Sequence, residues 1–225
     1  MPVKISRREE SGKVAQASGR WSNYFSQAGG LCHSEAMTRT EKLLAELIAL
    51  PSVNPAFAPQ GAAEPRWPVA QASRLQPATE GGRRDARATA KFGEKNVADF
   101  LATVAARVGL EVEFQKVLPG RSNVIARLLP PGKIRQTILL APHLDTVGAD
   151  DSQFVPRRKN GRLYGRGACD TKGSVAAMLT ALCELANRKS RPSETEIVFA
   201  GLVDEENAQA GSRALVRCPA FRRFG

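Results

Sequence analysis

Two apolar runs, each as long as a β-strand, constrain this 225-residue chain more than any other feature. Residues 137–141 (TILLA) run into the motif HLD, and residues 196–203 (EIVFAGLV) run into the motif DEE. A short apolar run bounded by polar residues is typical of a strand buried inside a sheet. Ligands in open α/β sheets gather beyond the carboxyl ends of such strands. The sequence therefore predicts a functional site where these two runs end.

Helical patterns separate the predicted strands. Thr38 and Glu41 have the spacing of a capping box at the start of an apolar stripe, and Gly109 is placed to end a second helix. Helices that alternate with buried strands predict an α/β sandwich. The predicted helices cover about residues 38–50, 93–108 and 173–187, and further strands cover 110–114 and 123–129.

The remaining segments carry most of the positive charge. We expect residues 1–36 to form a loose arm and residues 58–92, rich in Pro, Ala, Arg and Gly, to form a flexible insertion in the domain 37–225. Together with residues 207–225 they hold nine of the eleven net positive charges. This distribution disfavours a nucleic-acid groove, and no apolar run is long enough to cross a membrane. Four scattered cysteines without a CxxC pair favour a reduced, cytoplasmic protein.

Three polar clusters lie at the ends of the predicted elements: His143-Leu-Asp145, Asp170 before a helix, and Asp204-Glu205-Glu206. Histidine nitrogen and carboxylate oxygen suit zinc or a similar divalent ion. Asp145 is placed to orient the His143 ring, and Asp170 could bridge two metals. Of the two adjacent glutamates, one can bind metal while the other accepts a proton. The alternatives are a surface histidine, a helix-capping aspartate and a solvated acidic turn.

These clusters carry a family resemblance. The segments LLAELIALPSVNP, HLDTV, GRLYGRGACDTKGSVAAMLTAL and IVFAGLVDEENAQAGSRAL resemble the family of two-metal hydrolases that includes acetylornithine deacetylase, succinyl-diaminopimelate desuccinylase, aminoacylase and carboxypeptidase. The resemblance covers residues 37–57 and 93–215. It implies a zinc-peptidase-like, three-layer α/β sandwich with a mixed, mostly parallel sheet. It also implies substrates that are N-acyl amino acids or small peptides, and a homodimer as a possible full-length form.

The same resemblance implies a role for each candidate residue. His143 would bind one metal and Asp145 would orient it, Asp170 would bridge both metals, Glu206 would bind the second metal, and Glu205 would be the general base. The metals would be two Zn²⁺ ions, with Co²⁺ or Mn²⁺ as substitutes. A cis peptide bond would follow Asp170. The implied reaction is metal-assisted amide hydrolysis.

Complete members of that family are longer and carry a lid or dimerisation domain and further metal ligands. After Glu206 this sequence contains no Asp, Glu or His. We therefore expect a truncated catalytic domain without the lid, with little activity of its own. Two alternatives stay open. One is a catalytically inactive fragment that retains the fold, and the other is a cysteine hydrolase that uses Cys169.

Overall fold

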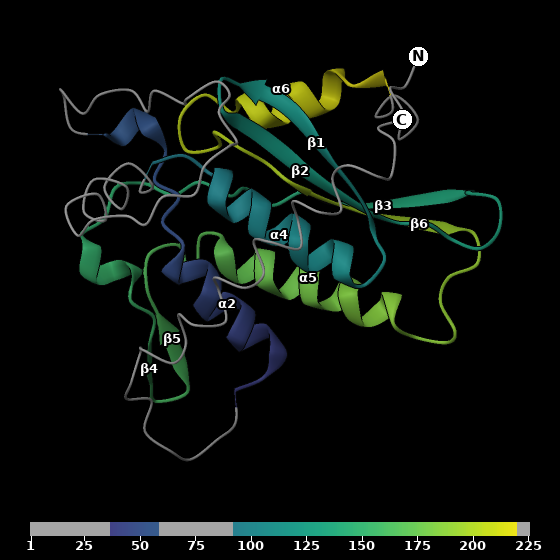
Figure 1. Ribbon diagram of the computed structural model, residues 1–225, viewed down its shortest axis with the longest axis horizontal. Helices are drawn as coiled ribbons and strands as arrows, with labels where there is room; N and C mark the ends of the chain where they lie inside the picture. The colour runs from purple at the N-terminus through teal and green to yellow at the C-terminus, as the bar shows by residue number, and fades with distance from the viewer. Residues whose placement is uncertain (1–36, 59–91, 220–225) are drawn as a thin grey trace, which may run out of the picture. The chain divides into compact units, whose positions relative to one another are not determined.

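The computed structural model describes residues 37–58 and 92–219, which build a four-stranded sheet and the helices around it (Figure 1). The strand order is β1-β2-β6-β3. β1 pairs with β2 and β2 with β6 in antiparallel fashion, whereas β3 and β6 run parallel. The strands are β1 (Glu111–Leu118), β2 (Arg121–Leu128), β3 (Gln136–Leu140) and β6 (Thr195–Gly201).

The predicted mixed sheet is confirmed, but among these strands the expectation that it is mostly parallel is wrong. Pro119 and Gly120 join β1 directly to β2, with Gly120 at a φ of 68°. A two-residue connection can only turn the chain back on itself, so it forces an antiparallel pair. A parallel pair needs a longer crossover, and α5 supplies one between β3 and β6.

The three predicted helices are present. Helix α2 (Arg39–Ala49) begins with the predicted capping box: the Thr38 hydroxyl accepts from the Glu41 N–H at 3.1 Å, and the Glu41 carboxylate accepts from the Thr38 N–H at 2.8 Å. Helix α4 (Lys95–Arg107) ends before Gly109, whose φ of 80° suits glycine at this position. Helix α5 (Lys172–Ala186) precedes β6. A fourth helix, α6 (Ala210–Arg217), was not predicted.

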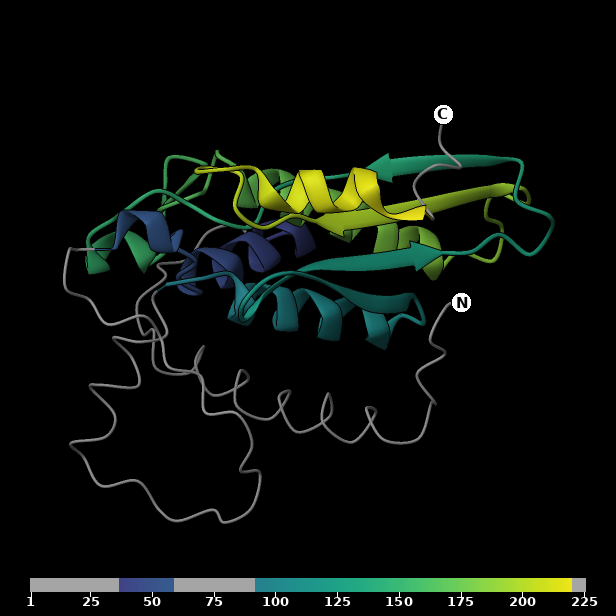
Figure 2. The ribbon, with the colours of Figure 1, turned by 90° about the horizontal axis from the view of Figure 1, so that it is seen from above.

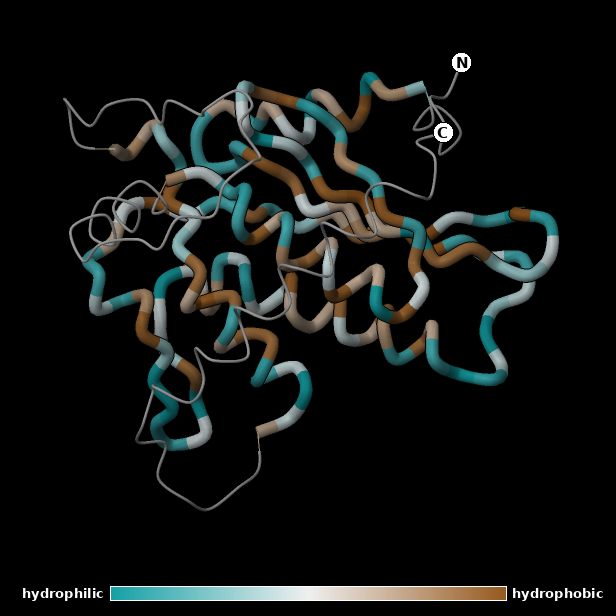
Figure 3. The backbone as a smooth tube through the Cα atoms, viewed as in Figure 1, coloured by the Kyte–Doolittle hydropathy of each residue, from teal (hydrophilic) through white to brown (hydrophobic). Residues whose placement is uncertain are grey.

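Helices cover both faces of the sheet, which confirms the three-layer arrangement. Neighbouring residues of a strand point to opposite faces, so Val124 and Ala126 of β2 pack with α2, α4 and α5. Ile125 lies between them and packs with Leu215 of α6. Figure 1 shows α6 across the strands from α4 and α5, and in Figure 2, seen from above, α6 lies in front of the sheet. The apolar segments in Figure 3 follow the strands and parts of these helices.

A small second sheet was also not predicted. Strands β4 (Arg157–Lys159) and β5 (Arg162–Tyr164) form an antiparallel hairpin. Asn160 and Gly161 connect them with φ values of 50° and 69°. Two positive φ angles in a two-residue loop match the turn for which Asn-Gly is the preferred pair. Two 3₁₀ helices, η1 (Pro55–Phe57) and η2 (Asp151–Phe154), complete the described elements.

The expected arm and nearly all of the expected insertion lie outside the described residues, so both stay predictions. The residues that flank the insertion are close together. Val53 forms a bridge with Phe92, and the Val53 carbonyl accepts from the Gly93 N–H at 2.8 Å. Val53 also forms a bridge with Thr146, which joins this region to the chain just beyond β3. In the part of the chain that the structure describes, no helix has the length and apolar character needed to cross a bilayer.

Candidate metal centre

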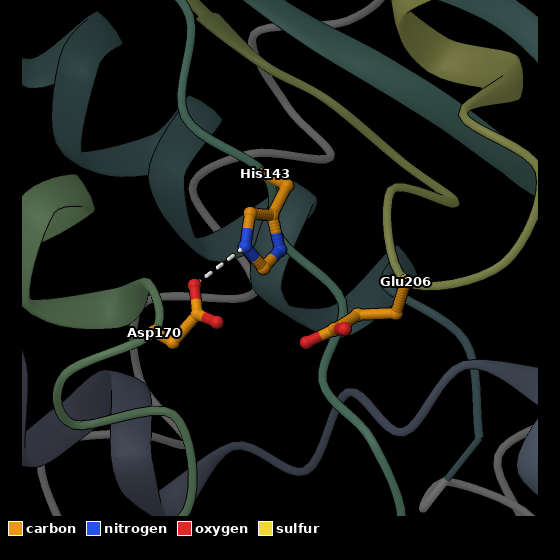
Figure 4. Close-up of side chains that lie close together, drawn as sticks. All are labelled: His143, Asp170 and Glu206. Atoms are coloured by element: carbon orange, nitrogen blue, oxygen red, sulfur yellow. Dashed lines mark hydrogen bonds and ion pairs between the residues drawn. The ribbon is translucent and has the colours of Figure 1, made fainter.

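Three predicted ligands meet at one edge of the sheet. His143 follows β3, Asp170 precedes α5, and Glu206 follows β6. One ligand atom from each side chain lies within 4.8 Å of the other two. Figure 4 shows the three side chains directed toward a shared space. The prediction that they cluster therefore agrees with the structure, although the roles assigned to them stay predictions.

The parallel pairing of β3 and β6 brings the HLD and DEE motifs together. Beyond the two strands, His143 still forms a bridge with Leu202. The Leu144 N–H donates to the Leu202 carbonyl at 2.8 Å, and the Leu202 N–H donates to the Pro142 carbonyl at 2.9 Å. Because the strands point the same way, both motifs leave the same edge of the sheet. Their proximity is a consequence of topology.

The His143 ring lies between two oxygen atoms. Nδ1 is 3.0 Å from the backbone carbonyl oxygen of Asp145, and Nε2 is 3.0 Å from Oδ1 of Asp170. A carbonyl oxygen can only accept, so Nδ1 carries a proton. Nε2 then faces a carboxylate, a contact that is favourable only with a proton or a metal ion on Nε2. The geometry leaves Nε2 as the ligand atom.

Protonation satisfies the same contact without a metal. Burial lowers the pKa of His143, but hydrogen bonds to Asp145 and Asp170 and nearby negative charges outweigh burial and raise this pKa from 6.5 to about 9. The same arrangement of carboxylates around one ring nitrogen is suited to a divalent cation, because a cation, like a proton, places positive charge among carboxylates.

Asp145 lies behind the histidine and is 1% exposed. Its carboxylate accepts from Asn54 Nδ2 at 2.7 Å and from the backbone N–H groups of Glu205 and Glu206 at 3.0 Å each. Its Oδ1 is 3.5 Å from His143 Nδ1. Burial raises the pKa of Asp145, but these donors outweigh burial and lower it below its usual range. Asp145 thus contacts His143 and also holds the turn that carries both glutamates.

Asp170 ends a tight turn that a buried lysine anchors. The Asp170–Thr171 peptide bond is cis, as the resemblance implied, and the Asp170 side chain is largely exposed. Two residues later, Lys172 is fully buried and donates to the carbonyl oxygens of Leu47 at 2.8 Å and Leu50 at 2.6 Å. These carbonyls lie at the end of α2. Burial lowers the pKa of Lys172 to about 7.

The two glutamates complete the site. Glu205 is partly exposed, and its Oε2 lies 3.8 Å from His143 Nε2. Burial raises the pKa of Glu206; His143 opposes this rise, whereas the carboxylates of Asp170, Asp145 and Glu205 add to it. Carboxylates that disfavour one another's charge are relieved by a cation. The donor set fits a divalent ion, with one nitrogen and several oxygen ligands.

Two buried polar residues of this site were not predicted. Asn54 lies in the quoted segment LLAELIALPSVNP, and Lys172 lies in the DTKG part of the quoted segment GRLYGRGACDTKGSVAAMLTAL. A polar side chain beside an apolar element gives a weak signal, because nothing in a sequence distinguishes a buried lysine from an exposed one. Their partners are 91 and more than 120 residues away along the chain.

Comparison with known proteins finds a family that the part of the chain around this site resembles. The model of peptidase family M20/M25/M40 matches residues 139–225, a range that contains all five candidate site residues. The chain is similar to this family over those residues. A putative [LysW]-lysine/[LysW]-ornithine hydrolase of Pyrococcus furiosus is 39% identical over 123 residues, which cover 54% of this chain and 32% of that relative. A peptidase M20 domain-containing protein of Schizosaccharomyces pombe is 38% identical over 118 residues, covering 50% and 28%.

A solved structure supports the fold. Aminopeptidase PepT from Bacillus cereus superposes with a TM-score of 0.52 at 22% identity, over 79% of this chain and 39% of that one. This likeness concerns the fold alone. The chain spans about a third or less of the length of the curated relatives that it matches.

Proposed function

We propose that this chain provides part of the catalytic domain of a metal-dependent hydrolase that cleaves amide bonds. The observation that carries the proposal is the meeting of His143, Asp170 and Glu206, each with a ligand atom within 4.8 Å of the others. The match of residues 139–225 to the M20/M25/M40 peptidase family supports it. Residues that are far apart in sequence converge on one point with the ligand types that zinc prefers.

The metal that fits this donor set best is zinc, with Co²⁺ or Mn²⁺ as substitutes. His143 would bind through Nε2, because Nδ1 donates to a backbone carbonyl. Asp170 is exposed and has two oxygens, which suits a carboxylate shared by two ions. Glu206 would then bind the second ion. A metal bound there would supply Lewis acidity to an amide carbonyl and lower the pKa of water.

Glu205 is the group that we assign to proton transfer. Its side chain is partly exposed and reaches within 3.8 Å of His143, so it borders the shared space that the ligands surround. There its carboxylate can accept a proton from the attacking water and return it to the nitrogen of the leaving amine. Asp145 would keep the His143 ring in one tautomer and, through two backbone N–H groups, keep Glu205 and Glu206 in place.

The substrate class that we propose is an N-acyl amino acid or a small peptide. The hydrolase name of the Pyrococcus furiosus relative is compatible with cleavage of an amide bond to an amino acid. A homodimer as the full-length form and a cytoplasmic location remain predictions from the sequence. Among the described residues, His143 does not favour the cysteine hydrolase alternative, because both of its ring nitrogens have oxygen partners.

Hydrolysis of a panel of N-acyl amino acids and dipeptides, with Zn²⁺, Co²⁺ or Mn²⁺ added, tests the proposal. We expect a chelator to abolish turnover, and Glu205→Gln to reduce turnover about 10²–10⁴-fold while metal binding is retained. Glu113→Gln is the matched control, because Glu113 is exposed on β1; this variant should equal the wild type.

Turnover that survives the chelator, or that Glu205→Gln leaves unchanged, would overturn the assignment. Loss of turnover with a thiol blocker but not with a chelator would instead favour Cys169 as the nucleophile. Zinc binding without any turnover would favour the alternative of an inactive fragment that keeps the metal site.

A further inference from the structure

A cluster of buried charges lies beneath the turn that carries Glu205 and Glu206. Glu94, at the start of α4, is fully buried, and Asp204 is 1% exposed. Arg121, the first residue of β2, donates from Nε and Nη2 to both oxygens of Glu94, at 2.7 and 2.6 Å. Its third nitrogen, Nη1, donates to Asp204 Oδ1 at 3.2 Å. One guanidinium therefore joins the start of α4, the start of β2 and the end of β6.

The cluster contacts the candidate metal centre through two routes. The Asp204 N–H donates to Glu94 Oε1 at 3.0 Å, so Glu94 holds the backbone of the turn. Asn54 Nδ2 donates both to Asp204 Oδ1 at 3.1 Å and to Asp145 Oδ2 at 2.7 Å. Asp145 in turn accepts the backbone N–H groups of the two glutamates. Every step from Arg121 to the ligand-bearing turn is a hydrogen bond.

The backbone at Asp204 needs such support. Its φ of 67° lies in the left-handed region, where a residue with a Cβ is disfavoured by about 1–2 kcal/mol. This conformation redirects the chain immediately before Glu205 and Glu206. A conformation of this kind persists only where surrounding contacts over-determine it, and Glu94, Arg121 and Asn54 supply those contacts here.

We infer that Glu94, Arg121 and Asp204 form a positioning cluster that fixes the turn from which Glu205 and Glu206 reach the metal centre. The inference rests on the proposed function only in that the turn is taken to carry metal-binding glutamates. The hydrogen bonds that fix the turn do not depend on that function. None of the three residues belongs to the donor set, so they act through the glutamates. Buried ion pairs contribute little net stability in many proteins. The position of this ion pair, directly beneath the turn, is explained if it holds the backbone of the turn in place.

The same strand offers a matched control. Arg127, near the other end of β2, donates from Nε to Glu196 Oε1 at 2.7 Å, and Glu196 is 4% exposed. Six residues of strand separate the two arginines by about 20 Å. The Arg127–Glu196 pair therefore tests what loss of a buried ion pair does to the fold alone, without contact with the DEE turn.

The experiment compares Arg121→Lys and Glu94→Gln with Arg127→Lys and Glu196→Gln in the full chain. The first readout is amide hydrogen exchange at Glu205 and Glu206 in the metal-free protein. The second is zinc affinity, measured by competition with a chelating dye. Arg121→Lys keeps the charge but loses the two-point contact with Glu94, so the protein stays folded while the turn is released.

We expect the first pair of variants to exchange these two amides at least 10-fold faster and to bind zinc about 10–100-fold more weakly. The control pair should lose stability without either change. If Arg121→Lys and Glu94→Gln keep the wild-type amide exchange rates and the wild-type zinc affinity, the cluster is only a structural ion pair and the inference is overturned. If the wild type binds no zinc, the proposed function fails, and the exchange rates alone decide whether the cluster positions the turn.

Discussion

At the scale of single residues, the contacts of His143 determine how the site responds to pH. The ring is held between a backbone carbonyl and a carboxylate, and its pKa is raised from 6.5 to about 9. A group whose pKa is higher in the folded state stabilises the fold fully below its unfolded pKa. This stabilisation is lost as the pH rises through the folded pKa.

We predict that, without metal, the stability difference between the wild type and His143→Ala shrinks as the pH rises from 6.5 to 9. The decrease should be on the order of 1–2 kcal/mol, since solvent partly screens the ring. Urea denaturation of both proteins across this range measures it. The variant serves as the reference for all other titrating groups, and a difference that stays constant with pH would contradict the prediction.

Single residues of the site differ in how well the sequence predicts them. His143, Asp170 and Glu206 were predictable because each directly follows an apolar strand or precedes an apolar helix. Their supporting residues were not. Arg121 and its partner Glu94 are separated by 27 residues, and Asn54 and Asp204 by 150, so only the folded chain brings each pair together. A buried polar contact leaves no periodic pattern in either segment.

At the scale of elements, Lys172 ties the start of α5 to the end of α2. Its ammonium group donates to the carbonyls of Leu47 and Leu50 at the C-terminal end of α2, where the last carbonyls of a helix need donors from outside its regular hydrogen bonds. The Leu47 carbonyl also accepts from the Leu50 N–H at 3.2 Å. The contact fixes the turn that presents Asp170 against a second helix. Removal of the ammonium group would leave two buried carbonyl oxygens without this donor.

We predict that Lys172→Ala lowers the free energy of unfolding by about 2–4 kcal/mol, because it removes a buried donor from two carbonyls and leaves a cavity. Lys172→Met fills the cavity but donates no hydrogen bond, so its loss should be smaller. Lys42→Ala, at an exposed position of α2, should change stability by less than about 0.5 kcal/mol. Chemical denaturation of the three variants measures these values. Equal stability of Lys172→Ala and Lys42→Ala would contradict the proposed anchoring.

Elements with strong local signals were predictable, whereas elements that depend on tertiary packing were not. The capping box of α2 and the glycine after α4 are local, and both helices begin and end close to the predicted residues. Helix α6 has only eight residues and buries just Gly211 and Leu215, so its apolar pattern is too short to recognise. Phe114 fits the alternating strand pattern but is 48% exposed, because β1 is an edge strand.

At the scale of the whole molecule, topology turns two separate motifs into one site. The parallel pair of β3 and β6 directs HLD and DEE to the same edge, and the crossover helix α5 brings Asp170 to that edge from the chain between them. The sequence predicted the α/β layers, since alternation of helices and strands is a global pattern. It did not predict the antiparallel majority, because strand direction depends on pairing between distant segments.

The central claim is that this edge of the sheet binds a divalent metal. The most direct test is anomalous X-ray diffraction at the zinc absorption edge from crystals grown with Zn²⁺. We predict an anomalous peak about 2.0–2.2 Å from His143 Nε2 and from carboxylate oxygens of Asp170 or Glu206. Zinc bound only at other residues, with these three side chains free of metal, would contradict the claim.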